Sequence, residues 1–155
     1  MNDIEAILDA EGVRGALRWL NEQVPHRYSA IYERQGKTLH NLYVFDKQNP
    51  AIRLFTDEPI IDTYCHLVFD TESNIQITNA SSDSRVQQHP KRTVVESYCG
   101  VPLRLANGEV FGTVCHFDPE PQTLNDAELQ VLEAAAQKIA PRLASMHGAD
   151  AGDKK

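Results

Sequence analysis

Apolar residues recur with two different periods along the chain, and the period separates helical segments from strands. Spacing of three or four residues, typical of an amphipathic helix, runs over residues 3–23 and again over residues 125–146. Gly12 interrupts the first of these segments and predicts a bend in it. Asn125 followed by Glu128 is typical of a capped helix start. The chain is therefore expected to begin and end with a long helix.

Short runs rich in β-branched and aromatic residues predict the strands. The segments "RYSAIYER" and "TLHNLYVFD" are separated only by "QGK", and this pattern is typical of a β-hairpin. A shorter run, "IQIT" at residues 75–78, predicts one more strand. Residues 60–69 instead carry apolar side chains at helical spacing and predict a short helix. The polar run "NASSDSRVQQHPKR" is expected to be a loop.

The stretch "SYCGVPLRLANGEVFGTVCHFD", residues 97–118, predicts a second hairpin. An Asn-Gly pair flanked by alternating apolar residues is the strongest local signal for such a turn. With that pair as the turn, Cys99 lies opposite His116 and Arg104 lies opposite Phe111. Both faces of the hairpin are largely apolar, so it is expected at the centre of the sheet, covered above and below.

The order of these elements predicts the fold class and the domain organisation. Strands joined by hairpins, with long helices at both ends, indicate an α+β fold around a central antiparallel sheet of about five to six strands. Residues 1–147 are predicted to form one domain, and the small and charged residues 148–155 are predicted to form a disordered tail.

Composition and charge limit the classes of partner. The net charge of −7 with scattered Lys and Arg argues against nucleic acid and against anionic membrane surfaces. No segment approaches the roughly 20 apolar residues that cross a bilayer. The acidic N-terminal segment is unlike a signal peptide, and three cysteines without close pairing suggest reduced thiols. The protein is therefore expected in the cytoplasm.

Several motifs resemble those of a GAF domain, over roughly residues 10–145. They are "TYCHLVF", "ITNASSDSR", the strand "GVPL" (100–103), the strand "GTVC" (112–115) and the following Asp118. The resemblance suggests a stand-alone GAF module of the bacterial signalling type. It implies that the terminal helices pack on one face of the sheet, where they often dimerise, and that short helices and loops enclose a ligand pocket on the other.

The resemblance places segments 60–69 and 79–98 beside the pocket and so suggests a set of ligand-binding residues. The aromatic members would supply apolar walls, and the polar members would fix a ligand. Arg85 is open to two interpretations: a bidentate clamp for an anion, or a local pair with Asp83. The predicted set is Tyr64, Cys65, Phe69, Asn79, Asp83, Arg85, Tyr98, Cys115 and Phe117. No catalytic residue and no metal ligand is predicted, and the residues do not identify a cofactor.

The cysteines raise the alternative of a thiol enzyme, because one branch of the GAF family reduces free methionine sulfoxide. That branch uses cysteines in the polar loop before the "GVPL"-like strand, and here residues 81–96 contain none. Cys99 and Cys115 lie inside strands among apolar residues, which is typical of buried and inert thiols. Cys99 and His116 are expected to be neighbours across the two strands. Such neighbours could form an activated thiolate pair or supply two metal ligands, but ordinary side-chain packing is the favoured interpretation.

Three functions remain open, and the residues favour a binding module over an enzyme. The first is a small-molecule-binding sensory module that acts through a homodimer of the terminal helices or through a signalling protein. The second is a thiol-dependent redox enzyme of the free methionine sulfoxide reductase type. The third is an interaction or dimerisation module without a ligand.

Overall fold

The computed structural model describes residues 3–153, with side chains for residues 3–145, and contains a six-stranded antiparallel sheet. The elements are α1 (Asp3–Glu22), β1 (Tyr28–Gln35), β2 (Thr38–Asp46), β3 (Glu58–Pro59), η1 (Ile60–Asp62), α2 (Cys65–Thr71), β4 (Ile75–Ile77), η2 (Ala80–Ser82), η3 (Ser84–Val86), β5 (Ser97–Arg104), β6 (Val110–Asp118) and α3 (Asp126–Asp153). The strand order is β3-β2-β1-β6-β5-β4. Within this described part, no helix is both long and apolar enough to span a membrane.

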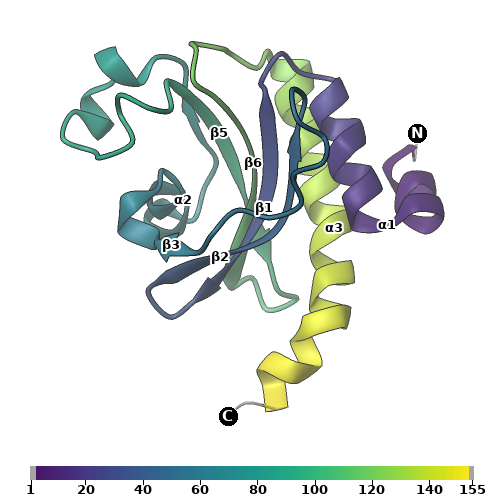
Figure 1. The fold of residues 1–155 in the computed structure, drawn as a ribbon. Helices are drawn as coiled ribbons and strands as arrows, with labels where there is room; N and C mark the ends of the chain where they lie inside the picture. The colour runs from purple at the N-terminus through teal and green to yellow at the C-terminus, as the bar shows by residue number, and fades with distance from the viewer. Residues whose placement is uncertain (1–2, 154–155) are drawn as a thin grey trace.

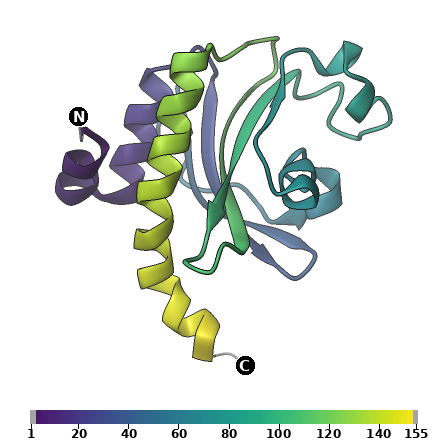
Figure 2. The same ribbon diagram turned by 180° about the vertical axis from the view of Figure 1, so that it is seen from behind.

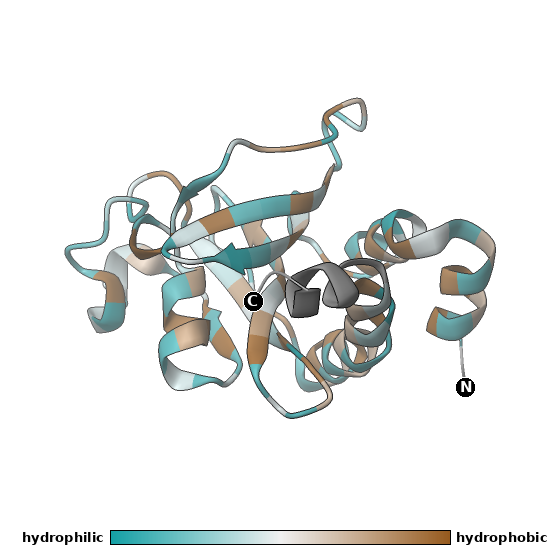
Figure 3. Cartoon of the chain, turned by 90° about the horizontal axis from the view of Figure 1, so that it is seen from below, coloured by the Kyte–Doolittle hydropathy of each residue, from teal (hydrophilic) through white to brown (hydrophobic). Residues whose placement is uncertain are grey.

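The sheet separates two layers, which confirms the predicted fold class. Helices α1 and α3 lie side by side against one face, and α2 with the short 3-10 turns covers the other (Figures 1 and 2). Hydrophobic and hydrophilic residues alternate along both the helices and the strands (Figure 3). The alternation divides the apolar side chains into two cores, one under the terminal helices and one under α2.

The hairpin of β5 and β6 lies in the interior of the sheet, as predicted. Strand β6 pairs with β5 on one side and with β1 on the other. Cys99 lies opposite His116, which confirms that part of the predicted register. The predicted pairing of Arg104 with Phe111 is wrong: Arg104 lies opposite Val110, because the ladder shifts by one residue at this end.

The shift follows from the geometry of the turn. The amide of Gly108 donates to the carbonyl of Leu105, so Ala106 and Asn107 occupy the centre of the turn. Gly108 comes next with a positive φ of 92°, a conformation that suits a residue without a Cβ. A turn of this kind adds a residue to one strand, and the register predicted from an Asn-Gly centre fails there.

The ends of the long helices agree with the sequence signals. Gly12 has φ 74° and ψ −171°, which confirms a bend inside α1. Before α3, the Asn125 amide donates to Glu128 Oε1 at 2.9 Å, and the Glu128 amide donates to Asn125 Oδ1 at 2.8 Å. This reciprocal pair is the predicted capping box.

The domain limits of 1–147 and the disordered tail of 148–155 stay predictions. Helix α3 continues through Asp153, and residues 1–2 and 154–155 lie outside the described residues.

The segment between β2 and β4 is more finely divided than predicted. The expected helix over residues 60–69 is a 3-10 turn, η1, followed by α2. Thr63 separates the two with an extended backbone, and its hydroxyl donates to the Ile60 carbonyl at 2.9 Å. The two-residue strand β3 pairs with the start of β2.

A chain of hydrogen bonds is buried between the sheet and α1. Lys47 Nζ donates to Asn21 Oδ1 at 2.6 Å, and Asn21 Nδ2 donates to Ser29 Oγ at 2.7 Å. Ser29 Oγ lies 2.5 Å from His116 Nδ1, within hydrogen-bond distance, so the chain ends on the imidazole of His116. His26, whose ring centroid is 5.8 Å from that of His116, is also buried.

Both histidines resist protonation in the folded state. Burial, with Lys47 also opposing protonation, lowers the pKa of His26 to about 4. Burial and the neighbouring His26 lower the pKa of His116 to about 3. Both values lie below the ordinary pKa of 6.5.

We predict that the protein loses stability as the pH falls from 6.5 towards 4. The unfolded chain binds protons on both histidines in this range while the folded chain does not, so each lowered pKa removes about 2 kcal/mol between pH 7 and 5. Urea unfolding at the two pH values measures the loss. His26→Phe should remove about half of the pH dependence, and an unchanged dependence in that variant would contradict the assignment.

Candidate functional site

A cavity of about 380 Å³ lies between the sheet and the layer that contains α2. Strands β1, β5 and β6 form its floor, and the segments 55–65 and 91–95 form its walls. Six aromatic side chains dominate the lining: Tyr28, Tyr32, Phe55, Tyr64, Tyr98 and Phe117. This composition is typical of a site for a small organic molecule.

Strand pairing arranges the aromatic wall. Tyr28 on β1 lies directly opposite Phe117 on β6, and their rings stack with centroids 5.0 Å apart. Phe55, from the loop after β2, meets the edge of Tyr28 at 5.7 Å. Offset and edge contacts of this kind hold aromatic rings in fixed orientations. The wall therefore presents a largely preformed apolar surface to an occupant.

The charged groups of the lining neutralise each other. Lys91 Nζ lies 2.6 Å from Glu58 Oε1, and the two side chains are 32% and 33% exposed. These are the charged residues among those that line the cavity, so their pairing leaves no net charge there. An anionic occupant would have to compete with Glu58 for the ammonium group. The arrangement suits an uncharged or zwitterionic molecule better than a phosphate.

Two thiols lie at the floor of the cavity. Cys65 opens α2, and its sulfur is 3.2 Å from the Tyr98 hydroxyl, which donates to it, and 3.4 Å from Thr113 Oγ1. Burial alone raises the pKa of Cys65, but hydrogen bonds from Cys115, Thr113, Tyr98 and Thr63 outweigh it and lower the pKa. The partner thiol, Cys115, has its pKa raised well above the ordinary value by burial and by Cys65.

Gly100 makes the contact between Tyr98 and Cys65 possible. The two residues Tyr98 and Gly100 lie on the same face of β5 because strand side chains alternate. A Cβ on Gly100 would lie 2.1 Å from the Tyr98 hydroxyl oxygen. The missing side chain is therefore what lets the tyrosine ring lie along the strand and reach the sulfur.

Five of the nine predicted ligand-binding residues line this cavity: Tyr64, Cys65, Tyr98, Cys115 and Phe117. Phe69 belongs instead to the core under α2, where the Arg34 guanidinium lies 5.3 Å from the centre of its ring. Its position one turn beyond Cys65 on the same helix directs it into packing.

The three polar members of the predicted set, Asn79, Asp83 and Arg85, lie outside the cavity lining. Arg85 Nη2 donates to Asp83 Oδ2 at 2.6 Å and to the Gln76 carbonyl at 2.7 Å. The Asn79 carbonyl accepts from the backbone of Ser82. Of the two interpretations of Arg85, the structure shows the local pair, because the guanidinium bonds to Asp83 and to the carbonyl of Gln76 on β4.

Sequence reasoning missed several lining residues, among them Tyr28, Tyr32, Phe55, Glu58 and Lys91. The alternation of Tyr28 and Tyr32 on one face of β1 was visible in the sequence, but the pairing of β1 with β6 that brings them to the cavity was not. The other three lie in loops or in the two-residue strand β3, where no periodicity marks a side chain.

Cys99 and His116 pack across the two strands, and His116 has its hydrogen-bond contact with Ser29. They lie opposite each other, on the face covered by α1 and α3. Burial raises the pKa of Cys99 to about 12. The predicted interpretation as cross-strand packing is confirmed for this pair.

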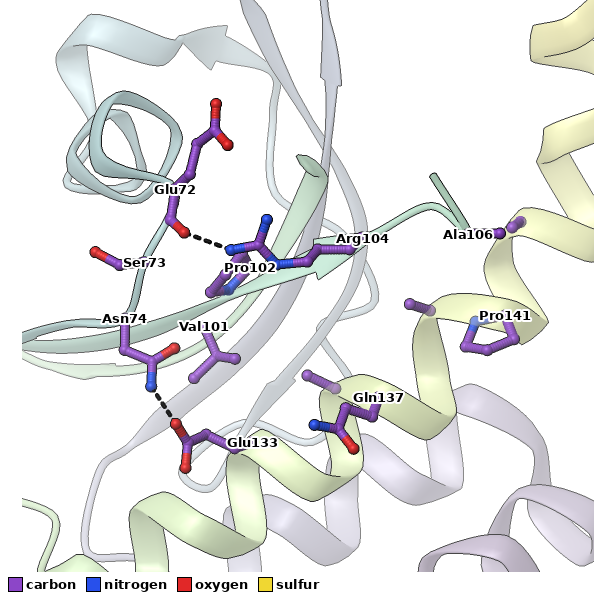
Figure 4. Close-up of a pocket in the computed structure, with 13 residues that line it drawn as sticks. Glu72, Ser73, Asn74, Val101, Pro102, Arg104, Ala106, Glu133, Gln137 and Pro141 are labelled. Atoms are coloured by element: carbon purple, nitrogen blue, oxygen red, sulfur yellow. Dashed lines mark hydrogen bonds between the residues drawn. The ribbon is translucent and has the colours of Figure 1, made fainter. Parts of the chain in front are cut away.

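A second hollow, of about 790 Å³, lies between α3 and β5 (Figure 4). Its wall on α3 consists largely of small side chains, Ala136, Ala140 and Ala144. Its polar groups bond across it: Asn74 donates to Glu133 at 2.5 Å, and Arg104 donates to the carbonyl of Glu72. This hollow has no aromatic side chain in its lining, whereas the cavity under α2 has six, so the cavity under α2 is the better candidate site. In neither place, nor elsewhere in the described residues, do three His, Cys, Asp or Glu side chains gather to hold a metal ion.

The sequence model described as "GAF domain" matches residues 8–143. The chain belongs to the GAF domain family. No curated protein matches it in sequence. The predicted resemblance is thus confirmed at the level of the family.

Solved structures with low sequence identity share the fold. The GAF domain of a phosphoenolpyruvate-protein phosphotransferase from Acinetobacter is 16% identical, with a TM-score of 0.76 over 94% of this chain and 90% of that one. The free methionine-R-sulfoxide reductase of Neisseria meningitidis is 13% identical, with a TM-score of 0.73 over 94% and 87%. A type II enzyme of the same name from Thermoplasma acidophilum is 15% identical, with a TM-score of 0.69 over 92% and 96%.

We predict that Gly100→Ala destabilises the protein by about 1–3 kcal/mol, because the new methyl group forces Tyr98 from its place in a packed core. Thermal or urea denaturation measures the change. The same substitution made in a Tyr98→Leu background should cost clearly less, since the clashing ring is absent. Equal costs in the two backgrounds would show that Tyr98 is not the residue that the methyl group displaces.

Proposed function

We propose that this GAF domain is a sensory module that binds a small molecule in the cavity under α2. The observation that carries the proposal is the aromatic lining of that cavity around one neutralised ion pair. Apolar walls with a few polar groups are what small-molecule sites share. Tyr64, Cys65, Tyr98, Cys115 and Phe117 are the predicted ligand-binding residues that this arrangement supports.

The ligand that fits this lining is an uncharged or zwitterionic molecule with a ring. Stacked and edge-on aromatic side chains favour a flat apolar body. In a zwitterionic ligand, the ammonium group could bind Glu58 and the carboxylate could bind Lys91. A phosphate would find no unpaired cation in the lining, because Lys91 is already paired with Glu58. Hydroxyl groups of Thr56 and Thr63 lie along the same wall.

The response would pass to a partner through the shared strands. Strands β1, β5 and β6 carry lining residues on one face and contact residues of α1 and α3 on the other. A ligand that displaces these strands changes the surface of the two helices. We propose that this surface forms a homodimer or binds a signalling protein. We also propose that the protein acts in the cytoplasm and that neither nucleic acid nor a membrane is its partner.

We predict that the freshly purified protein carries a small molecule, or accepts one, in this cavity. Native mass spectrometry beside a denatured spectrum should show a mass that is lost on denaturation, and the same spectrum reports whether the chain is a dimer. For protein without a bound molecule, indole is the neutral ring-containing probe and cyclic AMP the phosphate-bearing one. At indole concentrations about 100-fold above its Kd, binding should stabilise the fold by about 2.7 kcal/mol in thermal unfolding.

Two substitutions test the location. Val95→Phe fills the cavity and should abolish the stabilisation by indole, while Ala144→Phe fills the hollow beside α3 and should preserve it. A stronger response to cyclic AMP than to indole would overturn the proposed ligand chemistry. A dimer that neither probe perturbs, with no bound mass, would support the interaction module instead.

A second candidate is a reductase of free methionine sulfoxide, favoured by the cysteines at the cavity floor. The segment between β4 and β5, where that branch of the family is expected to carry cysteines, has none. We therefore predict no formation of methionine from free methionine sulfoxide in the presence of dithiothreitol. Steady production of methionine that disappears in Cys65→Ser would establish the enzyme in place of the sensor.

A further inference from the structure

We propose that protonation of His89 opens the cavity under α2 by releasing residues 87–95, the segment that forms one of its walls. The inference rests on the proposed function in one respect, because an opening wall regulates the site only if the cavity holds a ligand. The opening itself can be measured on the protein without any ligand.

Two polar contacts join this segment to the wall formed by residues 55–65. Lys91 Nζ lies 2.6 Å from Glu58 Oε1, and the Tyr64 hydroxyl donates to the Val95 carbonyl at 2.8 Å. All four of these residues line the cavity. A change in the polar contacts of the segment therefore acts directly on a wall of the site.

His89 supplies a third contact, and its partners determine which ring nitrogen carries the proton. Nδ1 accepts a hydrogen bond from the Lys91 amide at 3.0 Å. Nε2 lies 3.1 Å from the Thr63 carbonyl oxygen, and it donates there because a carbonyl oxygen can only accept. The closed wall therefore requires a neutral His89 imidazole with its proton on Nε2.

Protonation of His89 removes one of these two hydrogen bonds. The imidazolium carries a proton on Nδ1 as well, so it cannot accept from the Lys91 amide, and two N–H groups then point at each other. This amide belongs to the residue whose ammonium group pairs with Glu58. Displacement of the Lys91 backbone thus also disturbs the ion pair that holds the two walls together.

Titratable groups surround His89 on the elements packed against it. On α2, the His66 ring stacks on it with centroids 5.5 Å apart, and His66 Nδ1 lies 3.2 Å from Asp70 Oδ2. The Tyr64 ring centroid is 4.7 Å away, and burial raises the pKa of Tyr64 to about 12, so it stays uncharged. On η1, Asp62 favours protonation of His89, as do two backbone carbonyls. Burial and His66 oppose it and prevail, so the pKa of His89 is lowered from the ordinary 6.5.

The direction of the pH effect follows from these contacts. The closed segment holds a neutral His89 whose pKa is lowered, whereas release of the segment restores the ordinary pKa of 6.5. The open form therefore binds more protons, and a falling pH favours opening. At pH 5.5 the equilibrium constant for opening should exceed its value at pH 7.5 by several-fold and at most by about tenfold.

Hydrogen–deuterium exchange of the full chain measures the opening, read by mass spectrometry on peptides that cover residues 87–95. After correction for the intrinsic pH dependence of exchange, the segment should exchange several-fold faster at pH 5.5 than at pH 7.5. His89→Gln is the matched control, because its neutral amide still forms hydrogen bonds and leaves His26 and His116 unchanged. Its corrected rates should be equal at the two pH values. Equal rates in the unchanged chain, or the same acceleration in His89→Gln, would overturn the proposal.

A second variant separates His89 from the histidine stacked on it. In His66→Gln the acceleration at pH 5.5 should persist, because the conflict between His89 Nδ1 and the Lys91 amide remains. Loss of the acceleration in His66→Gln alone would assign the effect to His66 and contradict the role of His89.

Indole, the neutral probe used above, tests the consequence for a ligand. Its dissociation should be faster at pH 5.5 than at pH 7.5 by the factor found in the exchange experiment, and His89→Gln should remove the difference. Equal dissociation rates beside accelerated exchange would show that the opening does not regulate the site. Absence of indole binding at both pH values would count against the proposed function alone, because the exchange result needs no ligand.

Discussion

The pairing of β6 with both β1 and β5 is the constraint on which the other features depend. Its side chains alternate between the two layers, so Val114 and His116 face the terminal helices while Thr113 and Cys115 face the cavity. A slip by one residue would exchange the two sets and bring His116 among the aromatic rings. Register in this strand therefore decides the helix packing and the candidate site together.

Polar groups on both faces of β6 make that register more specific than apolar packing alone. On one face His116 ends a chain of hydrogen bonds that runs from Lys47 through the buried side chains of Asn21 and Ser29. On the other, Thr113 lies within reach of the Cys65 sulfur. Buried polar groups without partners are costly, so each of these contacts penalises alternative pairings.

The same strands connect the candidate site to the layer of the two terminal helices. Tyr28 lines the cavity, and the next residue, Ser29, belongs to the hydrogen-bond chain under α1. Neighbouring residues of one strand cannot move independently, because the backbone joins them across the sheet. The cavity and the helix layer are therefore separated by only one strand thickness.

Periodicity and turn chemistry in the sequence determined the terminal helices, the two hairpins, the bend at Gly12 and the capping box before α3. These features depend on neighbours within a few residues, which is why local patterns reveal them. Tyr64 and Tyr98 could likewise be predicted among the residues that line the cavity. Only the tertiary structure decided that Tyr28 and Lys91 join the cavity and that Cys65 contacts Tyr98 and Thr113. Those contacts join segments far apart in the chain, and their geometry is set by strand order and loop paths that no local pattern encodes.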